Sequence, residues 1–405
     1  MTIQEIRNQI PTLKEKVYGR QLVYFDNAAT SLRPQSVIDK WEEMSRNKNA
    51  NIHRAVHKLA VDATEEYESS RDAIREFINA PARENIVFTS GATASINLVA
   101  FCFAEQYLRA GDEIIICEAE HHSNIVPWQL ACERKGATIK VLPVDDNGSI
   151  EISSIDSLLT ERTKLLCVAH ISNVLGIINP VKEIVARCHA KGCAVLVDGA
   201  QGIVHGKVDV QDMDCDFYAF SGHKVYAAPG TGVLYAKAKW LDSFPPFFGG
   251  GEMIENVSFA KTTYAKAPGK FEAGTQNFAS VPTFKPAIEF VKELQEIEDQ
   301  YDGLVKYLYG ELSSDERITL YGTPRNPEEK TGIFSFCVKG AHHEDLALLL
   351  DKMGFALRSG QMCAEPLMDR FGVSGMLRLS AAPYNTIEEA ADFIKALNRA
   401  INMLV

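Results

Sequence analysis

Short, continuously apolar runs recur between residues 22 and 237, and they constrain the fold more than any other feature of the sequence. Longer amphipathic segments separate several of them, such as residues 93–111, which close on Gly111. Continuous apolar runs are typical of strands buried on both faces, and helices commonly end at glycine. The alternation predicts an α/β fold with a mainly parallel sheet. The runs lie at residues 22–25, 85–91, 112–120, 138–144, 164–172, 194–201, 216–224 and 232–237.

The pattern changes in the last third of the chain. Residues 243–280 are rich in glycine, proline and aromatic residues, which predicts a long loop or a hairpin. In the final helix, Thr386 and Glu389 form a capping box. The other elements expected here are helices over 285–312 and 343–354 and strands over 332–340 and 375–382.

These two patterns predict two domains. We expect a large α/β domain over residues 21–282 and a smaller α+β domain over residues 283–405, with residues 1–20 packing nearby. A chain of 405 residues is longer than a typical single domain, in agreement with this division.

Charge and cysteine content exclude several classes of protein. The net charge is −11 and no basic stripe is visible, so nucleic acid is not an expected partner. No apolar run is long enough to cross a bilayer, and the N-terminus lacks the apolar core of a signal peptide. Nine cysteines, an odd number, favour a reducing cytoplasm. Cys188, His189 and Cys193 lack the second ligand pair of a zinc site, so no metal site is predicted.

Polar residues follow five of the predicted strands directly. In open α/β sheets, ligands bind at the carboxyl ends of the strands, so these residues are expected to converge on one site. Each alone carries little information, because loops are polar by default. The five segments are 90–93, 121–122, 172–173, 198–201 and 221–224.

Three of these segments indicate a particular chemistry. Thr93 opens a helix whose N-terminus can hold a phosphate, although an ordinary N-cap explains it equally well. Asp198 ends a buried strand and needs a cationic partner such as a protonated ring nitrogen, or it caps a helix. Lys224 follows a strand end and is either a solvated charge or an amine suited to Schiff-base chemistry. Together they predict a pyridoxal 5′-phosphate site.

At these residues the chain resembles a known family, the cysteine desulfurases of the SufS type (group II). These are class V aminotransferase-fold enzymes, which bind pyridoxal phosphate on fold type I. The resemblance spans residues 24 to 386. The matching stretches are YFDNAAT, NIHRAVHKLA, EHHSNIVPWQ, HISNVLG, VDGAQ, SGHKVYAAPGTGVLY, KFEAGTQN, RSGQMCAEPLM and LRLSAAPYNT.

The resemblance implies a role for each matching residue. Lys224 would bind the cofactor covalently and move a proton, His121 would stack on its ring, and Cys363 would accept sulfur. Arg378 would bind the substrate carboxylate with help from Asn173, since a guanidinium forms bidentate hydrogen bonds with carboxylates. The remaining cofactor-binding residues would be Thr93, Asp198, Gln201, Ser221 and His223, with Thr275 contributed by a neighbouring subunit.

Cys363 lies in a polar stretch that reads as an exposed loop. In a desulfurase, a thiolate attacks the sulfur of bound L-cysteine, keeps it as a persulfide and leaves alanine. An exposed loop thiol can do this, and Arg358, five residues earlier, would favour the thiolate and contribute to substrate binding. The alternative is an incidental surface cysteine. Family members often have two histidines before this cysteine, where this chain has Gln361 and Met362.

The expected function is therefore desulfuration of L-cysteine, and of L-selenocysteine as a second substrate, in a cytoplasmic homodimer. A protein sulfur acceptor and a role in sulfur mobilisation such as iron–sulfur cluster assembly are implied by the resemblance. One alternative keeps the cofactor but changes the reaction to transamination or to β-elimination. Another is a persulfide-relay or scaffold-binding protein with vestigial catalysis, against which Lys224, Asp198 and His121 argue.

Overall fold

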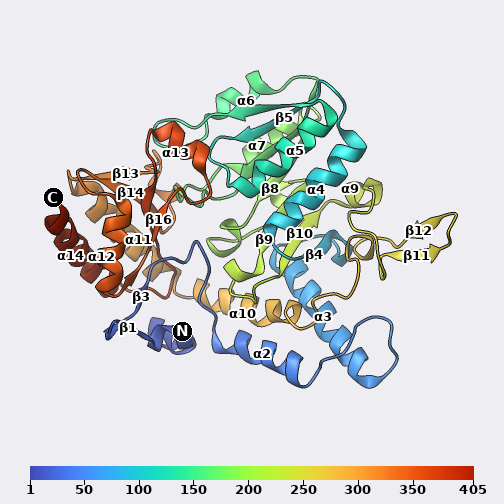
Figure 1. The fold of residues 1–405 in the computed structure, drawn as a ribbon, viewed down its shortest axis with the longest axis horizontal. Helices are drawn as coiled ribbons and strands as arrows, with labels where there is room; N and C mark the ends of the chain where they lie inside the picture. Colours follow the sequence, from blue (N-terminus) through green and yellow to red (C-terminus); the bar gives the residue numbers. More distant parts are fainter.

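The computed structural model describes residues 1–405, and a seven-stranded sheet lies at its centre (Figure 1). Its strand order is β4-β10-β9-β8-β7-β5-β6. The strands from β9 to β6 are mutually parallel, whereas β10 runs antiparallel to both β4 and β9. The α/β fold with a mainly parallel sheet is thus confirmed. The strands are β4 (Ile86–Thr89), β5 (Glu113–Cys117), β6 (Thr138–Leu142), β7 (Thr163–Ala169), β8 (Ala194–Asp198), β9 (Phe217–Ser221) and β10 (Gly232–Ala236).

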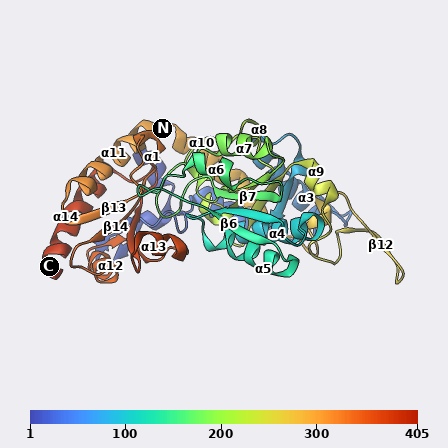
Figure 2. The ribbon, with the colours of Figure 1, turned by 90° about the horizontal axis from the view of Figure 1, so that it is seen from above.

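Both faces of this sheet are buried, which explains its continuously apolar strands. Successive side chains of a strand point to opposite faces. On β8, Val195 and Val197 belong to one apolar core, and Leu196 belongs to the other. Helices cover both faces in Figure 2, with α7 on one side and α4 and α5 on the other. The covering helices include α3 (Lys58–Phe77), α7 (Val181–His189) and α10 (Phe284–Gln295) on the first face, and α4 (Ala92–Tyr107) and α5 (Val126–Lys135) on the second.

An antiparallel four-stranded sheet lies in the C-terminal part, at the left of Figure 1. Its core is shared with three helices. The last of them starts at the predicted capping box, in which Thr386 Oγ1 accepts from the Glu389 N–H at 3.1 Å. The strands are β13 (Ile318–Tyr321), β14 (Ile333–Val338), β16 (Arg358–Gly360) and β17 (Met376–Ser380), and the helices are α11 (Glu298–Ser314), α12 (His343–Lys352) and α14 (Ile387–Leu404).

The N-terminal residues contact both parts of the molecule. Ile6 lies in the apolar core on the α7 face of the central sheet, while Arg7 pairs with Glu389 of α14 at 2.6 Å. The first predicted apolar run is β3 (Val23–Tyr24), which pairs with β15 (Phe355–Ala356) and not with the central sheet. The domain limits drawn at residues 282 and 283 stay a prediction.

The predicted helix over 285–312 is two helices, because its apolar residues serve two cores. Phe290 of α10 packs in the core of the central sheet, and Leu308 of α11 packs in the C-terminal core. The chain turns between them at Ile297. Residues 243–280 contain a hairpin, β11 (Ile254–Val257) and β12 (Thr262–Tyr264), which projects from the molecule at the right of Figure 1. No helix combines the length and apolar character that crossing a bilayer requires.

A buried ion pair joins α3 to the loop that follows the hairpin. Arg71 donates to both carboxylate oxygens of Glu272, at 2.7 and 2.9 Å, and the side chains are only 2% and 5% exposed. Glu272 also accepts from the Phe88 N–H of β4 at 2.8 Å. The pair therefore ties a helix, a strand and a loop together at one buried point.

Neutralising this carboxylate is expected to destabilise the fold. Glu272→Gln removes the buried counter-charge of Arg71 and leaves it only the more exposed Glu68, which costs about 3 kcal/mol. The measurement is the thermal melting temperature by calorimetry. Glu42→Gln is the control, because the Arg46–Glu42 pair is 72% and 55% exposed and its loss should leave the melting temperature unchanged. Equal shifts in the two variants would contradict this account.

Candidate active site

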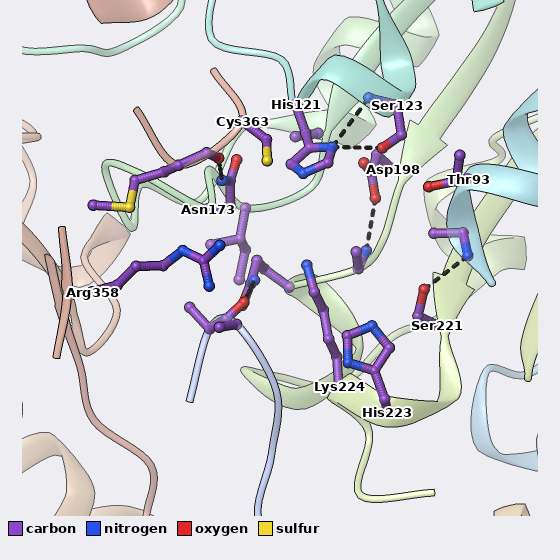
Figure 3. A pocket seen from close by; sticks show the side chains of 18 of the residues that line it. Thr93, His121, Ser123, Asn173, Asp198, Ser221, His223, Lys224, Arg358 and Cys363 are labelled. Atoms are coloured by element: carbon purple, nitrogen blue, oxygen red, sulfur yellow. Dashed lines mark hydrogen bonds between the residues drawn. The ribbon is translucent and has the colours of Figure 1, made fainter. Parts of the chain in front are cut away.

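A cavity of about 200 Å³ lies at the carboxyl ends of the parallel strands. Asp198 and Ser221 line it at the ends of β8 and β9, and Arg358 lines it from the C-terminal sheet (Figure 3). Arg378 lines it from the same sheet. The structure brings together every predicted site residue except Thr275, and their chemical roles stay predictions at this point. The predicted residues that line the cavity are Thr93, His121, Asn173, Asp198, Gln201, Ser221, His223, Lys224, Arg358, Cys363 and Arg378.

One end of the cavity suits an anion. It is the N-terminus of α4, where the Ala92 N–H donates to Ser221 Oγ at 2.8 Å and the Thr93 side chain is exposed. Backbone N–H groups and the helix dipole favour negative charge there. The turn is held close to β10: a Cβ on Gly232 would lie 2.3 Å from Gly91 Cα, so only glycine fits. This corner can hold a phosphate.

His223 lies beside this corner. Its Nδ1 is 3.3 Å from Thr30 Oγ1. Burial, with Lys224 and Arg33 nearby, lowers the pKa of His223 to about 4. The imidazole is therefore neutral at pH 7 and contributes hydrogen bonds rather than charge.

Asp198 and Lys224, a carboxylate and an amine, both line the cavity, and each affects the pKa of the other. Burial raises the pKa of Asp198, and Lys224 offsets part of this effect. Burial lowers the pKa of Lys224, against the opposing effect of Asp198. Asp198 Oδ1 accepts from the Ala200 N–H at 2.9 Å, and Lys224 forms no salt bridge. Both groups are thus free to bind a ligand. Asp198 can pair with a cationic nitrogen, and the Lys224 amine can form a bond to a carbonyl carbon.

Together, these groups fit a flat cofactor that carries a phosphate at one end and a cationic ring nitrogen at the other. Gln201 also lines the cavity, and its Nε2 donates to the Ala28 carbonyl at 2.8 Å. The donor set contains no cluster of three or more His, Cys, Asp or Glu side chains close enough for a metal ion.

His121 borders the cavity on another side. Its Nδ1 lies 2.6 Å from Ser123 Oγ and accepts from the Ser123 N–H at 3.1 Å (Figure 3). Burial, followed by the charge of Lys224, lowers the pKa of His121 to about 4. Sequence reasoning missed Ser123, although it stands two residues after His121 in the same polar segment.

Arg378 offers unused hydrogen-bond donors. It is 2% exposed; its Nη1 donates to the Asn173 carbonyl at 2.8 Å, and its Nη2 donates to Asp26 Oδ1 at 3.1 Å. Its Nε is buried and has no partner. A buried guanidinium that lines the cavity and has an unpartnered donor is suited to a carboxylate.

Two features of this region were not expected from the sequence. The Asn173 side-chain amide donates to the Met362 carbonyl at 2.9 Å, and its help in substrate binding stays a prediction. Asp26, from the YFDNAAT stretch, fixes Arg378 and lies 3.9 Å from Arg358. Asp26 could have been suspected, because a buried arginine such as Arg378 requires a counter-charge.

Cys363 sits on a fixed loop at the cavity. Both Met362 and Cys363 have left-handed backbone angles, with φ of 54° and 56°. The His122 N–H donates to the Cys363 carbonyl at 2.8 Å, and His122 Nε2 accepts from the Glu365 N–H at 3.0 Å. Because the flanking Met362 and Ala364 are buried, the exposed thiol is presented from a loop anchored on both sides.

Thr275 lies outside this cavity. It lines a second one, of about 270 Å³, together with Phe248 and Ser90. Its contribution from a neighbouring subunit stays a prediction.

The fold and this cavity define an enzyme of the class V aminotransferase type. Residues 23–393 match the model of the family "Aminotransferase class-V", so the chain belongs to that family.

Several relatives resemble the chain over its whole length. It is 43% identical to a probable cysteine desulfurase from Vibrio cholerae, with 100% of both chains covered. It is also 43% identical to a cysteine desulfurase from Cronobacter sakazakii, covering 100% of this chain and 99% of that one. The crystal structure of the cysteine desulfurase CsdA (S-sulfonic acid) from Escherichia coli superposes with a TM-score of 0.91 at 37% identity, covering 100% of both chains. The apo structure of a cysteine desulfurase from Thermococcus onnurineus NA1 gives a TM-score of 0.93 at 36% identity, covering 100% and 99%.

The nine thiols should differ sharply in reactivity. Cys363 is the exposed one, Cys337 is half-buried, and the other seven are buried. Brief treatment of the native protein with iodoacetamide should therefore add one alkyl group per chain, located at Cys363 by peptide mass spectrometry. Cys363→Ser should remove this fast modification. Fast alkylation persisting in that variant would show that a second thiol is accessible.

Proposed function

We propose that the chain is a pyridoxal 5′-phosphate-dependent cysteine desulfurase, which converts L-cysteine to L-alanine and carries the sulfur on Cys363. One observation carries this proposal: a thiol on an anchored, exposed loop borders the same cavity as Lys224 and Arg378. Transaminases of the same family have no need of a nucleophilic thiol at that place.

The cofactor would be held at three points. The α4 N-terminus with Thr93 and Ser221 binds its phosphate, Asp198 pairs with its ring nitrogen, and Lys224 binds it covalently. His121, His223 and Gln201 line the same cavity and complete the pocket. When bound, the cofactor withdraws electrons from the α-carbon of the substrate and makes its Cβ–S bond breakable.

Arg378 orients the substrate. Its free Nε and its Nη donors hold the carboxylate of L-cysteine, while Asp26 and the Asn173 carbonyl keep the guanidinium in place. The Lys224 amine has no salt-bridge partner, and its lowered pKa suits it to take and return a proton at the α-carbon.

Cys363 then takes the sulfur. Its thiolate attacks the substrate sulfur, an S–S bond forms and the Cβ–S bond breaks. The electron pair of that bond stays with the carbon skeleton, which is protonated and leaves as alanine. A persulfide remains on Cys363, where the exposed loop offers it to an acceptor or to a reductant.

Product analysis tests this reaction. Purified enzyme given L-cysteine and a dithiol reductant should form alanine and sulfide in equal amounts. Cys363→Ala should lower the rate by at least about a hundredfold, because the variant has lost its nucleophile. Cys337→Ala is the matched control and should keep wild-type activity, because that thiol is half-buried and outside the cavity. Pyruvate and ammonia, formed equally well by Cys363→Ala, would instead establish β-elimination.

We further propose a cytoplasmic homodimer in which Thr275 completes the cofactor site of the neighbouring subunit. The single chain supports this, because Thr275 lies apart from the cavity that holds the other predicted cofactor residues. Residues 21–282 would form the cofactor-binding domain and residues 283–405 the small domain. L-Selenocysteine as a second substrate and a protein sulfur acceptor, as in iron–sulfur cluster assembly, belong to the same proposal.

Light scattering at micromolar concentration tests the dimer and should give twice the mass of one chain. Thr275→Ala should weaken retention of the cofactor about tenfold while leaving the dimer intact, because one hydrogen bond to a charged phosphate is lost. A monomer with full cofactor retention would contradict both statements.

A further inference from the structure

The hydrogen bonds of His121 define which of its ring nitrogens carries the proton. The Ser123 backbone N–H points at Nδ1 from 3.1 Å, and a backbone N–H can only donate. Nδ1 is therefore an acceptor and carries no hydrogen. The Ser123 hydroxyl, 2.6 Å from the same nitrogen, must then donate as well. In the neutral ring the hydrogen sits on Nε2.

The Nε2 edge of the ring faces the cavity (Figure 3). A neutral imidazole in this tautomer offers the cavity a hydrogen-bond donor and no lone pair. In this state His121 cannot act as a base toward anything bound there. Its contribution is a fixed N–H aimed at an acceptor atom of the cofactor or the substrate.

We propose that Ser123 is a positioning residue for desulfuration: its hydroxyl, together with its backbone N–H, holds His121 as the uncharged Nε2–H tautomer, so that His121 acts as a hydrogen-bond donor. This inference rests on the proposed function for its catalytic consequence. The hydroxyl's one hydrogen bond with another side chain is to the His121 ring.

The surrounding charges act in the same direction. Lys224, the adjacent His122, Arg378 and Arg358 all disfavour a positive ring and lower the pKa of His121. The other titratable groups that line the cavity are Asp198, His223 and Cys363. Hydrogen bonds donated to Nδ1 stabilise the neutral form and lower the pKa further. Loss of the Ser123 hydroxyl must therefore raise it.

Deuterium exchange at the C2 position of histidine, followed by mass spectrometry of the holoenzyme over a pH series, reads the pKa of each histidine separately. Ser123→Ala should move the His121 midpoint upward by about half to one pH unit, the effect of one hydrogen bond. Ser123→Thr keeps the hydroxyl and should leave it in place. His205, which burial alone holds at a pKa of about 4, is the internal control and should stay fixed in all variants.

Kinetics provide a second readout. Ser123→Ala should lower kcat about fivefold with little change in KM, and Ser123→Thr should restore it. An unmoved His121 midpoint in Ser123→Ala, or a Ser123→Thr variant that behaves like Ser123→Ala, would overturn the role of the hydroxyl. The exchange measurement needs no turnover. A shifted midpoint in an enzyme that forms no alanine would therefore support the Ser123 assignment and refute the proposed function.

Discussion

Burial of both faces of the central sheet is the constraint on which the rest of this molecule depends. A strand covered on both sides can carry polar side chains only where it ends, and parallel strands place their carboxyl ends at one edge. Asp198 and Ser221 are the last residues of β8 and β9, and Lys224 follows β9 by one short turn. The direction and burial of the strands thus bring the polar groups of the cavity to one edge of the sheet, and contacts among these groups are not required.

The C-terminal sheet supplies what the central sheet cannot. Arg378 lies in the middle of β17 and reaches across to the Asn173 carbonyl, at a loop after β7. The Asn173 amide in turn holds the Met362 carbonyl, next to the thiol. Asn173 therefore connects the Arg378 guanidinium, through its backbone carbonyl, with the loop that carries Cys363, through its side-chain amide. Displacement of one sheet relative to the other would change both distances at once.

Much of this could be predicted from the sequence, because it depends on local patterns. Continuous apolar runs located the seven central strands, and the residues after them located the cavity, since strand direction alone decides where those residues meet. The assignment of the remaining run, residues 22–25, to the central sheet was wrong. Two of its residues pair with a distant strand, which periodicity does not show. The helix predicted over 285–312 failed because its apolar residues point into different cores, a fact of tertiary packing.

Side-chain partners were harder to predict than positions. Asp26 bonds to Arg378, and Ser123 bonds to His121. The tertiary structure decides which neighbour a carboxylate or a hydroxyl binds, and the sequence does not show it. The clamp of His122 on the loop after residue 362 joins residues more than two hundred positions apart, so no spacing rule applies.

The left-handed backbone at Met362 and Cys363 has a consequence for how the protein can change. Side chains with a Cβ adopt this conformation at a cost of about 1 kcal/mol each, and glycine adopts it freely. Glycine at residue 363 would relax the loop but would remove the thiol. Under the proposed function, the need for the thiol therefore opposes replacement of Cys363 by glycine, although glycine would give a more stable loop.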